Sequence, residues 1–180
     1  MNETILKSLI HLFAIISNLK YEVKQVVERN YVESYLIRQF SKKVAEKYLK
    51  IFDDQFAYYK RKTRDFSSDD IIKYNSLVMG ITKEINIELP LKERIMLIIN
   101  LLEFNKYSES YTLESPSYFN DLIEKIAENL LIPIEGFISI RAFVEDTLYK
   151  VPVKRNILLI KINALMKNIL GGVNYGLMNC

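Results

Sequence analysis

The feature that most constrains the fold is a unit that occurs twice: an apolar helix, a polar loop and an amphipathic helix. The first copy reads LIHLFAIISN, then LKYEVKQVVE, then RNYVESYLIRQF; the second reads RIMLIINLLEF, then NKYSESYTLE, then SPSYFNDLIEKIAENLLI. Apolar residues at helical spacing give each helix a stripe that has to be buried. Two such pairs can bury their stripes against each other, so the repeat predicts one helical domain.

Helical periodicity continues over most of the chain. Apolar spacing and capping residues predict about seven helices, at about 3–17, 23–40, 42–59, 68–86, 90–104, 116–131 and 133–146, with a loop at 105–115. The helix that begins at Pro90 is nearly continuous in apolar residues from Ile95 to Leu102. We therefore expect it to be the central, most buried helix.

The pattern changes beyond Val151-Pro152. Residues 157–162 are rich in β-branched side chains and predict a short strand, followed by a glycine-containing tail without a helical period. A lone strand leaves backbone groups unpaired. We therefore expect residues 1–148 to form the helical domain. Residues 149–180 are then an extension that either docks on the helices or begins a further domain, and the weakly patterned tail favours the second alternative.

Length and composition indicate a globular protein. A chain of 180 residues with 49% hydrophobic residues, five glycines and four prolines fits one folded domain. The sole cysteine, Cys180, excludes an intramolecular disulfide and suits a reducing compartment. The apolar stretch at 9–19 is too short to span a bilayer and lacks the features of a signal peptide. We expect a soluble, cytoplasmic protein without a transmembrane segment.

Charge is distributed unevenly along the chain, but the excess of either sign is small. Residues 1–66 carry 13 Lys/Arg against 8 Asp/Glu, whereas residues 67–130 carry 6 against 11. This argues against a dedicated nucleic-acid binder. The one basic run comprises Lys60, Arg61, Lys62 and Arg64, next to two tyrosines. It predicts a solvated turn between helices, or alternatively a surface for an anionic protein or lipid partner.

The sequence contains none of the common short motifs for catalysis. It contains no glycine-rich phosphate loop, no Walker pattern and no metal-type cluster of Cys and His. The only histidine, His11, lies one residue off the main apolar stripe of its helix, so we expect a partly buried or surface histidine without chemistry. We accordingly expect no catalytic residues and no cofactor.

Four segments resemble the helical repeat of the tellurite-resistance TerB-like family, in the version found at the N-terminus of large bacterial ABC-type ATP-binding proteins. They are LIHLFAIISN at 9–18, YVESYL at 31–36, EKYLKIFDD at 46–54 and RIMLIINLLEF at 94–104. The resemblance covers about residues 3–146 and rests on apolar rhythm and loop placement. It implies an all-α, TerB-like helical bundle. The implied role is a non-catalytic interaction or regulatory module, the N-terminal accessory domain of a larger ABC-transporter-like protein. Its partners would be other proteins or domains of the same polypeptide.

Members of that family hold a cation in an acidic Ala-Asp-Gly-Glu loop after the first helix of each repeat. Here the first loop keeps only Glu22 and Glu28, with Lys20 near the position of the first Asp, and the second loop offers Glu109. Hard cations need several converging oxygen ligands, and a nearby ammonium opposes their binding. We expect no metal site, with these three glutamates as solvated surface carboxylates. The alternative to an interaction module is a divalent-cation-binding stress-response protein of the tellurite-resistance type. A hydrolase that uses carboxylates of the loops is the third and least favoured function.

Overall fold

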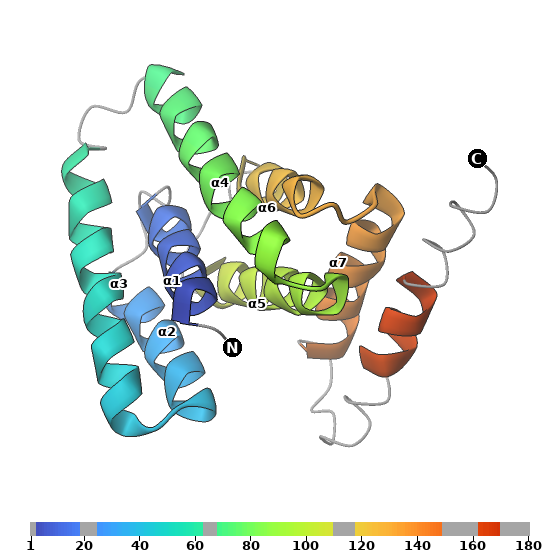
Figure 1. Ribbon diagram of the computed structural model, residues 1–180, viewed down its shortest axis with the longest axis horizontal. Coiled ribbons are helices and arrows are strands. Elements are labelled where there is room, and N and C mark those ends of the chain that lie inside the picture. Colours follow the sequence, from blue (N-terminus) through green and yellow to red (C-terminus); the bar gives the residue numbers. More distant parts are fainter. Residues whose placement is uncertain (1–2, 19–24, 63–67, 110–117, 149–161, 170–180) are drawn as a thin grey trace.

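The computed structural model describes residues 3–18, 25–62, 68–109, 118–148 and 162–169. These residues form eight helices and no strand (Figure 1), which confirms the all-α class. Seven helices are α1 (Glu3–Asn18), α2 (Gln25–Gln39), α3 (Lys42–Lys62), α4 (Ser68–Glu88), α5 (Leu91–Glu109), α6 (Tyr118–Asn129) and α7 (Ile134–Leu148), and the eighth covers 162–169.

The central helix is α1, which contacts α2, α3, α4 and α5 (Figure 1). Its described side chains are buried on almost every face, from Ile5 to Ser17. A helix that is apolar all round has no face for solvent and is therefore enclosed by others. The expectation that the helix after Pro90 is the most buried is wrong, because α5 keeps an exposed side that includes Lys92 and Lys106.

An aromatic cluster joins the two helix–loop–helix units. The ring of Phe13 on α1 lies 4.8 Å from that of Phe104 on α5, and 6.0 Å and 5.7 Å from those of Tyr31 and Tyr35 on α2. Edge-to-face and tilted packing at these distances is favourable beyond the burial of area. The apolar stripes of α1, α2 and α5 are thus buried against one another, as the repeat predicts.

The second loop begins later in the chain than expected. Residues 105–109, which the sequence placed in a loop, continue α5 as helix. Asn105 is buried in this extension, and the ring of Tyr107 lies 5.4 Å from that of Tyr31 on α2. The ring contact with α2 and the burial of Asn105 stabilise an additional helical turn, which the polar sequence of residues 105–109 does not predict.

The helix at 162–169 packs beside α7 (Figure 1). Leu165, Met166 and Ile169 are buried in the hydrophobic core, and a Cβ added at Gly136 of α7 would lie 3.3 Å from the Ile169 side chain. Of the strand expected at 157–162, residues 157–161 lie outside the described residues. Ile162 begins a helix, so the strand is wrong at that residue.

None of the helices in the described ranges combines the length and apolar character that crossing a membrane requires.

Candidate functional site

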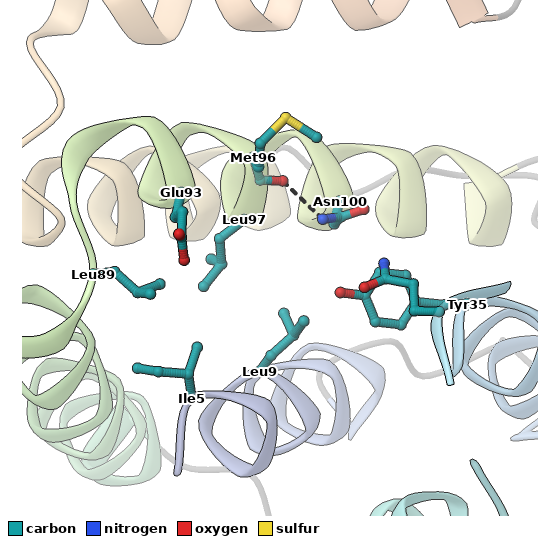
Figure 2. Close-up of a pocket in the computed structure, with 9 residues that line it drawn as sticks. Ile5, Leu9, Tyr35, Leu89, Glu93, Met96, Leu97 and Asn100 are labelled. Atoms are coloured by element: carbon teal, nitrogen blue, oxygen red, sulfur yellow. Dashed lines mark hydrogen bonds between the residues drawn. The ribbon is translucent and has the colours of Figure 1, made fainter. Parts of the chain in front are cut away.

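A pocket of about 270 Å³ opens where α1, the end of α2 and the beginning of α5 meet (Figure 2). We refer to it as the α1–α5 pocket. Its lining residues come from three parts of the chain: Ile5, Leu9, Tyr35, Gln39, Leu89, Glu93, Met96, Leu97 and Asn100. Ligand pockets for drug-sized molecules start at about 300 Å³, so this volume suits one or two aliphatic side chains.

Aliphatic side chains form the floor of the pocket. Ile5 and Leu9 lie one turn apart on α1, and Figure 2 shows them converging with Leu89 and Leu97 from the opposite side. Residues four positions apart share one helix face, which explains why Ile5 and Leu9 face the same space. Leu89 lies in the connection before α5, and Leu97 lies on α5. An apolar group that enters the pocket would therefore exchange water for hydrocarbon contacts.

Polar groups lie at the edge of this floor. Figure 2 shows the Glu93 carboxylate and the Tyr35 hydroxyl reaching toward the pocket from different helices. Burial raises the pKa of Tyr35 to about 12, against the lowering effect of a hydrogen bond with Gln39. The Tyr35 hydroxyl therefore stays protonated at neutral pH.

An amide supplies a further polar group. Asn100 Nδ2 donates a hydrogen bond of 2.8 Å to the Met96 carbonyl oxygen. The Met96 thioether is directed away from the pocket (Figure 2). The pocket can therefore hold an apolar group and orient a polar atom attached to it.

The predicted basic residues lie elsewhere. Lys60 and Arg61 are exposed in the last turn of α3, Lys62 ends the helix, and Arg64 lies outside the described residues. Arg61 Nε donates to the Ala57 carbonyl oxygen at 3.2 Å. The expectation of a turn is therefore wrong for residues 60–62. Basic side chains are favourable at a helix C-terminus, which explains why the helix continues.

The structure does not bring these basic residues to the pocket. Because α3 begins just after α2 ends and is 21 residues long, its basic end lies about 30 Å along the helix from Gln39. Lys60 and Arg61, which we call the basic end of α3, therefore form a separate surface.

The candidate metal ligands have different positions. Glu22 lies outside the described residues, and Glu109 ends α5. Glu28 is 0% exposed, so the expectation of a solvated surface carboxylate is wrong for this residue. It shares the buried face of α2 with Val32 and Tyr35, a spacing that already indicated burial. Within the described ranges, no three metal-binding side chains lie close enough to hold an ion.

His11 is partly buried on α1, as expected, and is not among the residues that line the pocket. Burial lowers its pKa, against the raising effect of Glu84 on α4.

The sequence does not indicate Gln39, Glu93 and Asn100 as site residues, because no short motif connects them. Comparison of the chain with protein-family models, curated proteins and solved structures finds no match. The resemblance to the TerB-like family stays a prediction, and the pocket is interpreted from its own chemistry.

Proposed function

We propose that this chain is a non-catalytic interaction module that receives an apolar side chain of a protein partner in the α1–α5 pocket. The observation that carries this proposal is the convergence of four aliphatic side chains on an open pocket with polar groups only at its edge. Interfaces of this kind obtain most of their affinity from a few anchor residues that fill such pockets.

The edge of the pocket defines the partner more closely. The Glu93 carboxylate favours a cationic group, and the Tyr35 hydroxyl can donate or accept a hydrogen bond. The partner is therefore a segment with a Leu, Ile or Met anchor next to a Lys or Arg. The charge would orient the segment, while burial of the anchor would supply the affinity.

The larger context is proposed from the sequence resemblance alone. The partner would be another domain of an ABC-transporter-like ATP-binding protein, in which this chain is the N-terminal accessory domain in the cytoplasm. The basic end of α3 would add weak association with an anionic surface. The reading frame and neighbouring genes test this part. We expect them to encode an ATP-binding cassette, and its absence from both would overturn the ABC assignment without affecting the pocket.

Photo-crosslinking in the native host tests the interaction. A photoreactive residue at Gln39, on the pocket edge, should give one discrete adduct with a partner. Leu89→Trp fills the pocket with a bulky ring and should abolish the adduct. Ile87→Trp places the same ring on a side chain that is 78% exposed and should leave the adduct unchanged. An adduct that persists in a folded Leu89→Trp protein would overturn the proposal.

The alternative, a divalent-cation-binding stress-response protein, has one observation in its favour. Glu28 is a buried carboxylate in the first turn of α2, directly after the loop in which the resemblance places a cation site. Against it stand Lys20 and the missing Asp-Gly pair. We expect calcium and zinc to bind no tighter than about 1 mM, the weak end of protein calcium sites. Calorimetry that shows micromolar binding, lost in Glu22→Ala or Glu28→Gln, would favour the alternative.

A further inference from the structure

The connection between α6 and α7 exposes large aliphatic side chains. Leu131, Ile134 and Ile138 are 69%, 48% and 59% exposed. Ile134 also lines a groove of about 430 Å³ with Glu124, Ala127, Glu128, Ile132, Pro133 and Phe137. We call this groove together with Leu131 and Ile138 the α6–α7 corner. Clustered exposed aliphatic side chains are typical of contact surfaces, whereas isolated ones need no explanation.

Leu131 has an unusual backbone conformation. Its φ is +56°, in the left-handed region that glycine ordinarily occupies after a helix. The Leu131 amide donates to the Glu128 carbonyl oxygen at 2.9 Å, and the Ile132 amide donates to the Ala127 carbonyl oxygen at 3.0 Å. This is the Schellman pattern of helix termination, with leucine where glycine would be free of strain. The chain therefore keeps an exposed leucine at a conformational cost.

The turn around Leu131 is held from the neighbouring helices. Arg94 of α5 donates through Nη1 to the Leu130 carbonyl oxygen at 2.7 Å and to Asn86 Oδ1 at 3.0 Å. Asn86 of α4 donates through Nδ2 to the Asn129 carbonyl oxygen. Strained residues persist where surrounding contacts fix them, and fixed groups lose less entropy on binding. Leu131 is therefore presented to solvent in a preorganised position.

Two carboxylates lie on the α6 wall of the groove. Glu124 and Glu128 are one helical turn apart, a spacing at which like charges repel. Within the described part of the chain, neither forms an ion pair. A cation between them would remove this repulsion. The groove thus combines an apolar surface with uncompensated negative charge.

We propose that the α6–α7 corner binds a basic amphipathic helix of a protein partner. The apolar face of this helix would pack on Leu131, Ile134 and Ile138, and its Lys or Arg side chains would reach Glu124 and Glu128. An amphipathic helix fits because it carries apolar and basic side chains side by side, which matches an apolar surface next to two carboxylates. Exposed aliphatic groups and a like-charged pair occur together here, and this occupant would bury the first and neutralise the second. This site is separate from the α1–α5 pocket.

A synthetic peptide tests the proposal. The probe is a fluorescein-labelled peptide of leucine and lysine at amphipathic helical spacing, and its counterpart has glutamate in place of lysine. Fluorescence anisotropy with the full chain should show saturable one-to-one binding of the lysine peptide that weakens with salt. The glutamate peptide should not bind. Equal binding of both peptides would overturn the proposal.

Variants of Leu131 locate the binding site. Leu131→Gly and Leu131→Ala should both weaken binding at least about tenfold, because an anchor residue is lost. Leu131→Gly should melt at or above the wild-type temperature, so unfolding cannot explain its loss of binding. Wild-type affinity in both variants would overturn the proposal.

Charge variants complete the test. Glu124→Gln with Glu128→Gln should weaken binding and reduce its salt dependence. The matched pair Glu84→Gln with Glu88→Gln, at the same spacing on α4, should leave binding unchanged; an equal loss there would indicate unspecific attraction and overturn the proposal.

Two further readouts separate the possible occupants. Leu89→Trp fills the α1–α5 pocket and should leave peptide binding at the α6–α7 corner unchanged. The two proposed sites can therefore be tested separately. Sedimentation of the chain alone should show a monomer, since a dimer abolished by Leu131→Ala would make a second copy the occupant.

Discussion

At the scale of single residues, the left-handed backbone conformation of Leu131 lowers the stability of the folded chain. The left-handed conformation costs a non-glycine residue about 1–2 kcal/mol, and glycine loses about 0.5–1 kcal/mol more backbone entropy on folding. Leu131→Gly is therefore expected to raise the free energy of unfolding by about 0.5–1 kcal/mol, measured with urea. Leu131→Ala keeps the strain and should not raise it. Equal effects of both substitutions would contradict this explanation.

His11 gives the chain a pH-dependent contribution to stability. Burial lowers its pKa in the folded state, so the unfolded chain binds more protons between that pKa and the usual value of about 6.5. The contribution of neutral His11 is complete above about pH 6.5 and is lost as the pH falls toward the folded pKa. Urea unfolding between pH 7 and pH 5 should therefore show wild type losing stability relative to His11→Gln.

The shifted pKa of Glu103 does not affect the comparison between wild type and His11→Gln. Burial raises the pKa of Glu103, whose contribution is lost as the pH rises and thus has the opposite sign. The difference between wild type and His11→Gln cancels that contribution. Parallel pH profiles of the two proteins would contradict the role of His11.

At the scale of helices, apolar spacing predicts where helices exist but not where they end. The helix that begins at Lys42 and the helix that ends at Glu109 both continue beyond their predicted ends. The last turn of α5 is stabilised by the contact between Tyr107 and Tyr31, residues far apart in the sequence. The high apolar content of α5 wrongly predicted that α5 is the most buried helix. Burial depends on how many helices surround a helix, and α1 is surrounded by four.

The basic end of α3 is expected to matter little for folding. Replacing Lys60, Arg61, Lys62 and Arg64 together by Ser removes favourable charges near a helix C-terminus, each worth about 0.3–1 kcal/mol when exposed. The melting temperature should fall by only a few degrees. If an anionic partner exists, its association rate and salt dependence should change much more. Loss of the cooperative thermal transition would show that this helix end is structural.

At the scale of the whole molecule, the pocket could not be predicted because its residues come together only in the folded chain. Ile5 and Asn100 line the same pocket from the two helix–loop–helix units. The sequence predicts that these units pack together, but it does not predict where their surfaces leave a gap. Tyr35 lies in the segment YVESYL at 31–36, and the sequence alone does not place its hydroxyl on the edge of a pocket.

The C-terminal helix contributes to the same core. Leu165, Met166 and Ile169 are buried, whereas the aromatic cluster around Phe13 is built from α1, α2 and α5. A chain ending at Lys150 is therefore expected to keep a cooperative transition, with a melting temperature lower by about 5–10 °C. Circular dichroism of both chains checks this. A non-cooperative transition in the shorter chain would show that helix 162–169 is indispensable.

Methyl-resolved NMR can show whether the α1–α5 pocket binds an apolar group. Isobutanol, which mimics a leucine side chain, is titrated into the full chain while methyl signals of Leu9, Leu89 and Leu97 are followed. We predict saturable shifts of these signals that disappear in Leu89→Trp and persist in Ile87→Trp. Shifts that are linear in isobutanol and alike across the surface would contradict the claim.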